Sequence, residues 1–199
     1  MRRRDFFKLG ARRTAQAVVG VLDERAERRA AGWIRPPFAR PELDFLLTCT
    51  RCDDCIEACP HDVLFALPAR LGLQVAGTPA MDLATKGCHM CADWPCVAAC
   101  EPNALVLAQA APDAPPTPPK LATARIDTSS CLPYSGPECG ACAHACPVDG
   151  ALRWVNGVKP VIDEQICTGC ALCREACITE PKSVLVSALV RDEEPAEAS

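Results

Sequence analysis

Apolar and polar residues follow two different periods along this chain of 199 residues. Over the first 33 residues, apolar side chains recur every three or four positions. This spacing predicts an amphipathic helix because it places those side chains on one face. The apolar stripe consists of Phe7, Ala11, Ala15, Val18, Leu22, Ala26, Ala30 and Trp33. The helix should end at Pro36-Pro37, since proline has no backbone N–H to donate and restricts the residue before it.

Beyond residue 41 the apolar runs are short, which predicts short strands joined by turns. The expected strands cover 63–67, 104–107, 122–127, 151–155, 158–162 and 183–190, with loop and strand over 71–79. Asn156-Gly157 separates two of these runs and predicts a hairpin, because both residues tolerate a positive φ. Residues 111–120 include five prolines and predict a linker between domains or a loop within one.

Sixteen cysteines stand between these short elements, in four quartets with none left over. The quartets are Cys49, Cys52, Cys55 and Cys59; Cys88, Cys91, Cys96 and Cys100; Cys131, Cys139, Cys142 and Cys146; and Cys167, Cys170, Cys173 and Cys177. Each unit is predicted to form a loop that carries three cysteines, a short helical turn that leads to the fourth cysteine, and a strand. A repeat of this kind predicts the architecture better than local propensity does.

The cysteine spacing favours iron–sulfur clusters over the other uses of thiols. Three closely spaced cysteines and a fourth several residues later, twice followed by proline, are typical of [4Fe–4S] ligation. Zinc sites usually combine two C-x-x-C pairs across a longer gap, and small disulfide frameworks space their cysteines more irregularly. No C-x-x-C-H haem attachment motif occurs. Sixteen thiolates therefore predict four [4Fe–4S] clusters with all sixteen cysteines as iron ligands.

Charge divides the chain into a basic arm and an acidic body. Residues 1–40 carry 11 Lys/Arg and 4 Asp/Glu, a net charge of +7, and the remaining residues carry 10 and 21, a net charge of −11. An acidic body argues against nucleic-acid binding. The arm suits an anionic membrane surface, which residues 1–34 could contact, or an acidic partner. It equally suits a solvated arm or one that rests on the acidic body of the same chain.

Three interpretations of the N-terminus stay open. Arg3-Arg4-x-Phe6-Phe7-Lys8 resembles a twin-arginine export motif, which would place the protein in the periplasm. The uncharged run after it, 14–22, is nine residues long, far short of the ~20 residues of a membrane span. The same residues also fit an amphipathic helix on a membrane, at the cytoplasmic face if there is no export, or a helix packed on the protein itself.

Residues beside the cysteines have supporting roles in this interpretation. Gly140 and Gly169 are expected to bring backbone N–H groups close to cluster sulfurs. Three histidines lie near cluster cysteines, but no corner of a cluster lacks a thiolate. The sequence contains no phosphate-binding loop, dinucleotide fingerprint, nucleophile triad or catalytic carboxylate pair. We therefore expect an electron carrier without a substrate site of its own.

With the quartets identified, the chain resembles the NapG/MauM group of ferredoxin-type proteins, with some features of the NapF type. The resemblance covers about residues 34–190. It is carried by Arg35-Pro36-Pro37, Arg51 within the first quartet, Gly77-Thr78-Pro79, Met90, Asp93 and Pro95 in the second quartet, the wide Cys131–Cys139 gap, and Ile178 with Glu180-Pro181 after Cys177.

The resemblance implies electron transfer from a quinol-oxidising membrane partner towards a terminal reductase, and a twin-arginine signal. Similar four-cluster subunits of membrane oxidoreductases pair their motifs in a nested way, first with fourth and second with third. By that resemblance Cys59 would complete the cluster of Cys167, Cys170 and Cys173, and Cys177 that of the first quartet. Consecutive pairing is the alternative. A protein that helps to assemble a partner metalloenzyme is the second functional hypothesis.

The expected fold is α+β, with duplicated bacterial-ferredoxin-like modules behind an N-terminal helix. The expected organisation is a basic segment over 1–40, a four-cluster domain over 41–190 and a polar tail over 191–199. No transmembrane span is expected.

Overall fold

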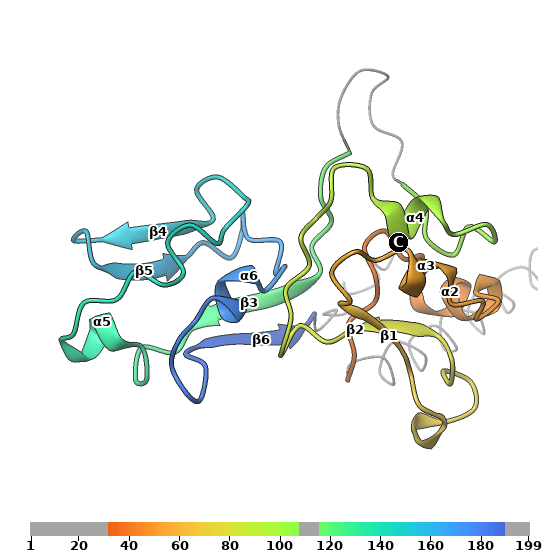
Figure 1. Ribbon diagram of the computed structural model, residues 1–199, viewed down its shortest axis with the longest axis horizontal. Coiled ribbons are helices and arrows are strands. Elements are labelled where there is room, and N and C mark those ends of the chain that lie inside the picture. The colour runs from red at the N-terminus through yellow and green to blue at the C-terminus, as the bar shows by residue number, and fades with distance from the viewer. Residues whose placement is uncertain (1–31, 108–115, 190–199) are drawn as a thin grey trace, which may run out of the picture.

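The computed structural model describes residues 32–107 and 116–189, which form two lobes side by side along the long axis (Figure 1). The predicted N-terminal helix lies almost wholly outside these ranges, as do the tail and part of the Pro-rich stretch. Within the described ranges, no helix is both long enough and apolar enough to cross a membrane. Short helices and strands alternate in both lobes, which fits the mixed α and β content of a ferredoxin-like fold.

The N-terminal lobe contains four short helices and one two-stranded antiparallel sheet. Its elements are α2 (Glu42–Thr48), α3 (Asp54–Glu57), β1 (Leu64–Ala66), η1 (Ala69–Leu71), β2 (Pro79–Met81) and α4 (Pro95–Ala98). β1 pairs with β2, with Phe65 opposite Ala80. The predicted strand over 63–67 is therefore confirmed at its centre. Phe45 is fully buried in the main core cluster, which several cysteines of this lobe also join.

The C-terminal lobe contains two antiparallel pairs of strands. Its elements are β3 (Ala122–Ile126), α5 (Leu132–Ser135), β4 (Leu152–Val155), β5 (Lys159–Ile162), α6 (Leu172–Glu175) and β6 (Val184–Ala188). β3 pairs with β6 across a long separation in sequence, and β4 pairs with β5 as the predicted hairpin. Asn156 and Gly157 have φ of 52° and 75°, the conformation for which this turn selects them.

Three local expectations differ from the structure. Residues 104–107 form no strand but a single bridge between Leu105 and Ala39, since the opposite segment follows Pro36-Pro37 and is too short to extend a ladder. Helix α2, which the sequence pattern did not predict, precedes the first quartet. Helix α5 occupies part of the Cys131–Cys139 gap, where only turns were expected.

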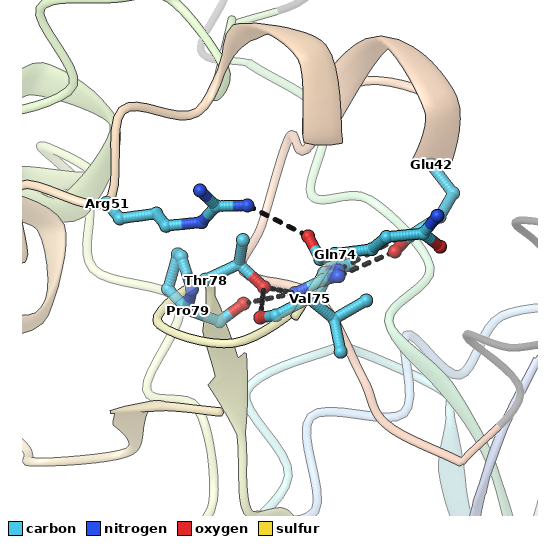
Figure 2. A network of polar contacts seen from close by, with 7 residues as sticks. Glu42, Arg51, Gln74, Val75, Thr78 and Pro79 are labelled. Carbon is cyan, nitrogen blue, oxygen red and sulfur yellow. Dashed lines mark hydrogen bonds and ion pairs between the residues drawn. The ribbon is translucent and has the colours of Figure 1, made fainter. Parts of the chain in front are cut away.

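A buried ion pair fastens the start of the described chain to the N-terminal lobe. Arg35 donates two hydrogen bonds to the Glu42 carboxylate, at 2.9 and 2.5 Å. It also donates to the Thr78 hydroxyl at 2.8 Å and to the Pro79 carbonyl at 2.9 Å. The side chains of Arg35 and Glu42 are only 10% and 4% exposed. Figure 2 shows this network, in which Arg51 also donates to the carbonyl of Gln74.

Several non-cysteine residues that carry the family resemblance thus meet in one place. Gly77 allows Arg51 to lie close, because an added Cβ would sit 3.3 Å from the Arg51 Cδ atom. Both Arg51 and Pro79 line a cavity that contains cysteines of the first quartet. These residues act as structural supports beside that cavity.

Replacing Arg35 by alanine is expected to lower the free energy of unfolding by about 3–5 kcal/mol, because the Glu42 carboxylate is left buried and unpaired. Arg153→Ala is the matched control. Its ion pair with Asp163 is exposed on the arginine side, and its loss should cost no more than about 1 kcal/mol. Anaerobic denaturant titrations of both variants measure the difference. Equal destabilisation would show that the Arg35 pair does not anchor this segment.

Candidate metal centres

The third cysteine of three quartets lies on a one-turn helix that starts after a left-handed residue. These residues are Asp53, Trp94 and Ala171, with φ of 67°, 45° and 68°. A non-glycine residue in that region costs about 1–3 kcal/mol and persists only where its surroundings hold it. The left-handed residue turns the chain sharply between the second and third cysteines, so that both cysteines face one cavity. In the third quartet this segment is a turn instead of a helix.

Each of these helices ends just before the fourth cysteine. Helix α3 ends at Glu57 before Cys59, α4 ends at Ala98 before Cys100, and α6 ends at Glu175 before Cys177. If the helix continued, cysteines four apart would stay on one face. Because it stops, the fourth cysteine is carried away from the first three and reaches a second cavity. This confirms the expected helical turn in three of the four units.

The sixteen cysteines, all free thiols, line four separate cavities in groups of four. Site I has Cys49, Cys52, Cys55 and Cys100. Site II has Cys59, Cys88, Cys91 and Cys96. Site III has Cys131, Cys139, Cys142 and Cys177. Site IV has Cys146, Cys167, Cys170 and Cys173. Each cavity holds about 320–380 Å³ of empty space, part of it open to solvent.

The nested pairing implied by resemblance to membrane oxidoreductase subunits is wrong for this chain. Cys59 lies in site II with the second quartet, and Cys177 lies in site III with the third. Consecutive quartets exchange their fourth cysteines, first with second and third with fourth. In the N-terminal lobe this happens because α3 and α4 pack against each other, so that each helix delivers its following cysteine to its neighbour's cavity.

The donor sets fit a cluster better than a single ion. Among the described residues, which include every cysteine, no three His, Cys, Asp or Glu side chains converge closely enough to hold one metal ion. Zinc with Zn–S bonds of about 2.3 Å would draw four sulfurs to within about 4 Å of one another. Four thiols spread around one cavity suit a cube that carries an iron at each of four corners.

Burial, together with neighbouring thiols, raises the pKa of several of these cysteines. Burial raises the pKa of Cys55 to about 12, and the nearby Cys100 and Cys49 add to the effect. Burial likewise raises the pKa of Cys96 to about 12, helped by Cys88 and Cys59. A metal ligand must be a thiolate, so loading such a site releases protons into the solvent. Iron bound there would supply the positive charge that four neighbouring thiolates need.

Cys173 repeats this behaviour in the C-terminal lobe, and Cys177 departs from it. Burial raises the pKa of Cys173 to about 12, with Cys170 as the next cause. At Cys177 burial acts in the same direction, but hydrogen bonds from Thr179 and from backbone N–H groups outweigh it and lower the pKa. The Thr179 hydroxyl lies 3.2 Å from the Cys177 sulfur and accepts the Ser183 N–H at 2.9 Å.

The sequence analysis did not identify Thr179 as part of this site. The pattern that could have identified it is a threonine two residues after a cysteine. Two backbone groups also donate to ligand sulfurs. The Leu105 N–H donates to Cys100 at 3.4 Å, and the Gly169 N–H donates to Cys167 at 3.3 Å. The Gly169 N–H thus points at a cysteine sulfur, and its expected approach to the sulfurs of a cluster stays a prediction. Gly140 has no heavy atom within 4 Å of the position of an added Cβ.

Two histidines that stand beside cysteines in the sequence stack on each other at site II. The rings of His61 and His89 lie 3.5 Å apart with an interplanar angle of 6°, and both line that cavity. Trp94 closes another part of the same cavity and packs edge-on against Phe38. These rings form a wall of the cavity, whose four sulfur donors are already cysteines.

Proteins with related sequences identify the family. The chain is 34% identical over 210 residues to the methylamine utilization ferredoxin-type protein MauM of Methylobacillus flagellatus, covering 92% of this chain and 82% of the relative. It is 33% identical to the ferredoxin-type protein NapG of Haemophilus influenzae, covering 92% and 71%. Against the ferredoxin-type protein NapF of Escherichia coli the identity is 31%, covering 79% and 87%.

No protein-family profile matches the chain, and no solved structure matches it. The relatives, however, span most of its length, and several residues behind the earlier resemblance line the thiol sites, among them Arg51, Pro95 and Ile178. This chain belongs to the NapG/MauM family of ferredoxin-type proteins.

Proposed function

We propose that this chain is an electron carrier that holds four [4Fe–4S] clusters, one in each of sites I to IV. The observation that carries the proposal is the division of sixteen free cysteines into four cavities of four, with none left over. A bound cluster of this type accepts and releases one electron. The chain's own part is to hold the thiolates, to exclude water by burial and to aim N–H and O–H donors at the sulfurs.

The physiological role proposed is that of an accessory subunit of a respiratory or redox enzyme system. Electrons would enter from a membrane partner that oxidises quinol and leave towards a terminal reductase, as in a nitrate reductase-like chain. The similarity to NapG and MauM supports such a partnership, because their names assign them to the ferredoxin type and, for MauM, to methylamine utilization. No substrate site is required for this role.

Anaerobic analysis of iron and acid-labile sulfide tests the cluster proposal. About 16 of each per chain are expected, since four clusters of four irons and four sulfides fill the sites. Reductive titration should then take up about four electrons per chain in one-electron steps. A preparation that contains only zinc, or iron without sulfide, would contradict the proposal.

A protein that helps to assemble a partner metalloenzyme is the second candidate, which the features shared with the ferredoxin-type protein NapF over 79% of the chain leave open. The two functions separate in one experiment on the reduced, loaded protein. An electron carrier oxidises its clusters when the partner reductase and its substrate are added. An assembly protein passes no electrons to the partner, yet the partner's cofactor content falls when this chain is missing.

A further inference from the structure

The two lobes contact each other through one cysteine of site II, one cysteine of site IV and the residues beside them. The backbone N–H of Cys88 donates to the carbonyl oxygen of Cys170 at 2.7 Å, so that two site residues are hydrogen-bonded across the lobe boundary. Beside this bond, the Thr168 hydroxyl lies 3.4 Å from the Met90 sulfur. We call the contact between residues 84–90 and 168–175 the seam.

Further bonds hold the seam close. The Gly87 N–H donates to the Glu175 carboxylate at 2.7 Å, and the Arg174 guanidinium donates to the Ala84 carbonyl at 2.8 Å. Gly87 is buried, and a Cβ added there would lie only 2.7 Å from the backbone nitrogen of Leu172. The two backbones therefore touch at this point, with no side chain between them.

Within each lobe, one pair of sites also adjoins. Cys55 of site I and Cys96 of site II belong to the same buried apolar cluster. Cys142 of site III and Cys173 of site IV belong to another. Site I follows α2 at one end of the long axis, and site III includes the start of α5 at the other end, with α6 between them (Figure 1).

We infer that the seam is the electron-transfer junction between the lobes, and that the sites stand in the order I, II, IV, III along the molecule. This rests on the proposed function. One electron leaves site II and one arrives at site IV, with no bond made or broken and no proton moved. Because tunnelling falls steeply with distance, the backbone contact between Cys88 and Cys170 makes the seam a short passage between the lobes. Sites I and III are then the two ends at which partners exchange electrons.

This spatial order differs from the order of the sites along the sequence. In sequence order, site III would follow site II and would lie at the junction between the lobes. Spectroscopy of two ligand variants distinguishes the two orders. Cys142→Ala removes the cluster of site III, and Cys173→Ala removes the cluster of site IV. Iron near 12 per chain in each verifies loss of one cluster. Each loaded protein is reduced with dithionite, and electron paramagnetic resonance records the spin interaction between neighbouring reduced clusters.

Removing site III should leave the interaction between the lobes intact. Removing site IV should abolish it and leave site III with the signal of an isolated cluster. If loss of site III, and not of site IV, disconnects the lobes, the proposed order is overturned. A wild-type protein that lacks about 16 irons would instead contradict the proposed function, so the two failures are distinguishable.

Gly87→Ala tests the seam without touching a ligand, since the new methyl group overlaps the Leu172 backbone and one side of the seam must shift. Full iron content with a weaker interaction between sites II and IV is the expected result. Gly32→Ala is the matched control, because it adds the same methyl group at an exposed position outside the four sites, where no atom lies within 4 Å of the added Cβ. An unchanged interaction in fully loaded Gly87→Ala would show that the electron passes elsewhere.

Discussion

Replacing Cys59 by alanine is expected to remove the cluster of site II and to leave site IV loaded. Cys59 shares its cavity with Cys88, Cys91 and Cys96, and the fourth thiol of site IV is Cys146. Iron should fall from about 16 to about 12 per chain, because a cube that loses one thiolate in a buried, crowded site is no longer held. Anaerobic iron and sulfide analysis measures the loss.

Double variants assign that loss to one site. Cys59→Ala combined with Cys91→Ala should still hold about 12 irons, since both cysteines serve site II. Cys59→Ala combined with Cys170→Ala should hold about 8, since two different sites are broken. The nested pairing predicts the reverse, about 8 for the first combination and about 12 for the second. These two numbers decide between the pairings without any spectral assignment.

Gly169→Ala is expected to be the most destabilising single-methyl change considered for this chain. Gly169 is buried with a φ of +73°, and an added Cβ would lie 2.0 Å from the carbonyl oxygen of Ala122 at the start of β3. Left-handed backbone costs a residue with a Cβ about 1–2 kcal/mol. Overpacking against backbone adds about 1–3 kcal/mol or more. Together these are a large part of the ~5–15 kcal/mol that stabilises a folded domain.

Gly157→Ala separates the two contributions. Gly157 has nearly the same φ, +75°, but no atom lies within 4 Å of its added Cβ. Its substitution should therefore cost only about 1–2 kcal/mol of backbone strain. Anaerobic denaturant titrations give both values, and chelator-driven iron loss should be faster only in Gly169→Ala, whose N–H donates to Cys167. Equal costs would mean that β3 does not pack on Gly169 as described.

Local structure was predictable wherever neighbouring residues decide it. The hairpin at Asn156-Gly157 formed as expected, since positive φ at two adjacent residues is a property of those residues. The helical turn before the fourth cysteine formed in three units, whereas the third unit, with the same spacing from its third to its fourth cysteine, forms a turn. Residues 104–107 failed as a strand because a strand depends on a partner, and the partner at Ala39 is short.

The supports around the sites could not be predicted from neighbouring residues. Arg35 reaches Glu42 seven positions away, but Thr78 and Pro79 are more than forty positions away, and nothing local indicates that they meet. The seam is a still longer connection, between Cys88 and Cys170. Such contacts depend on how whole lobes pack, which residue periodicity does not encode.

The sequence alone determined which residues supply the thiols, because sixteen cysteines in four spaced quartets leave few chemical alternatives to iron–sulfur ligation. It also predicted that a short helical turn leads to the fourth cysteine of each quartet, a pattern in which that cysteine serves another cluster in two-cluster ferredoxins. Only the tertiary structure decided where that cysteine goes. The packing of α3 against α4 sends Cys59 to the cavity of the second quartet, because each of these helices ends beside the cavity of its neighbour.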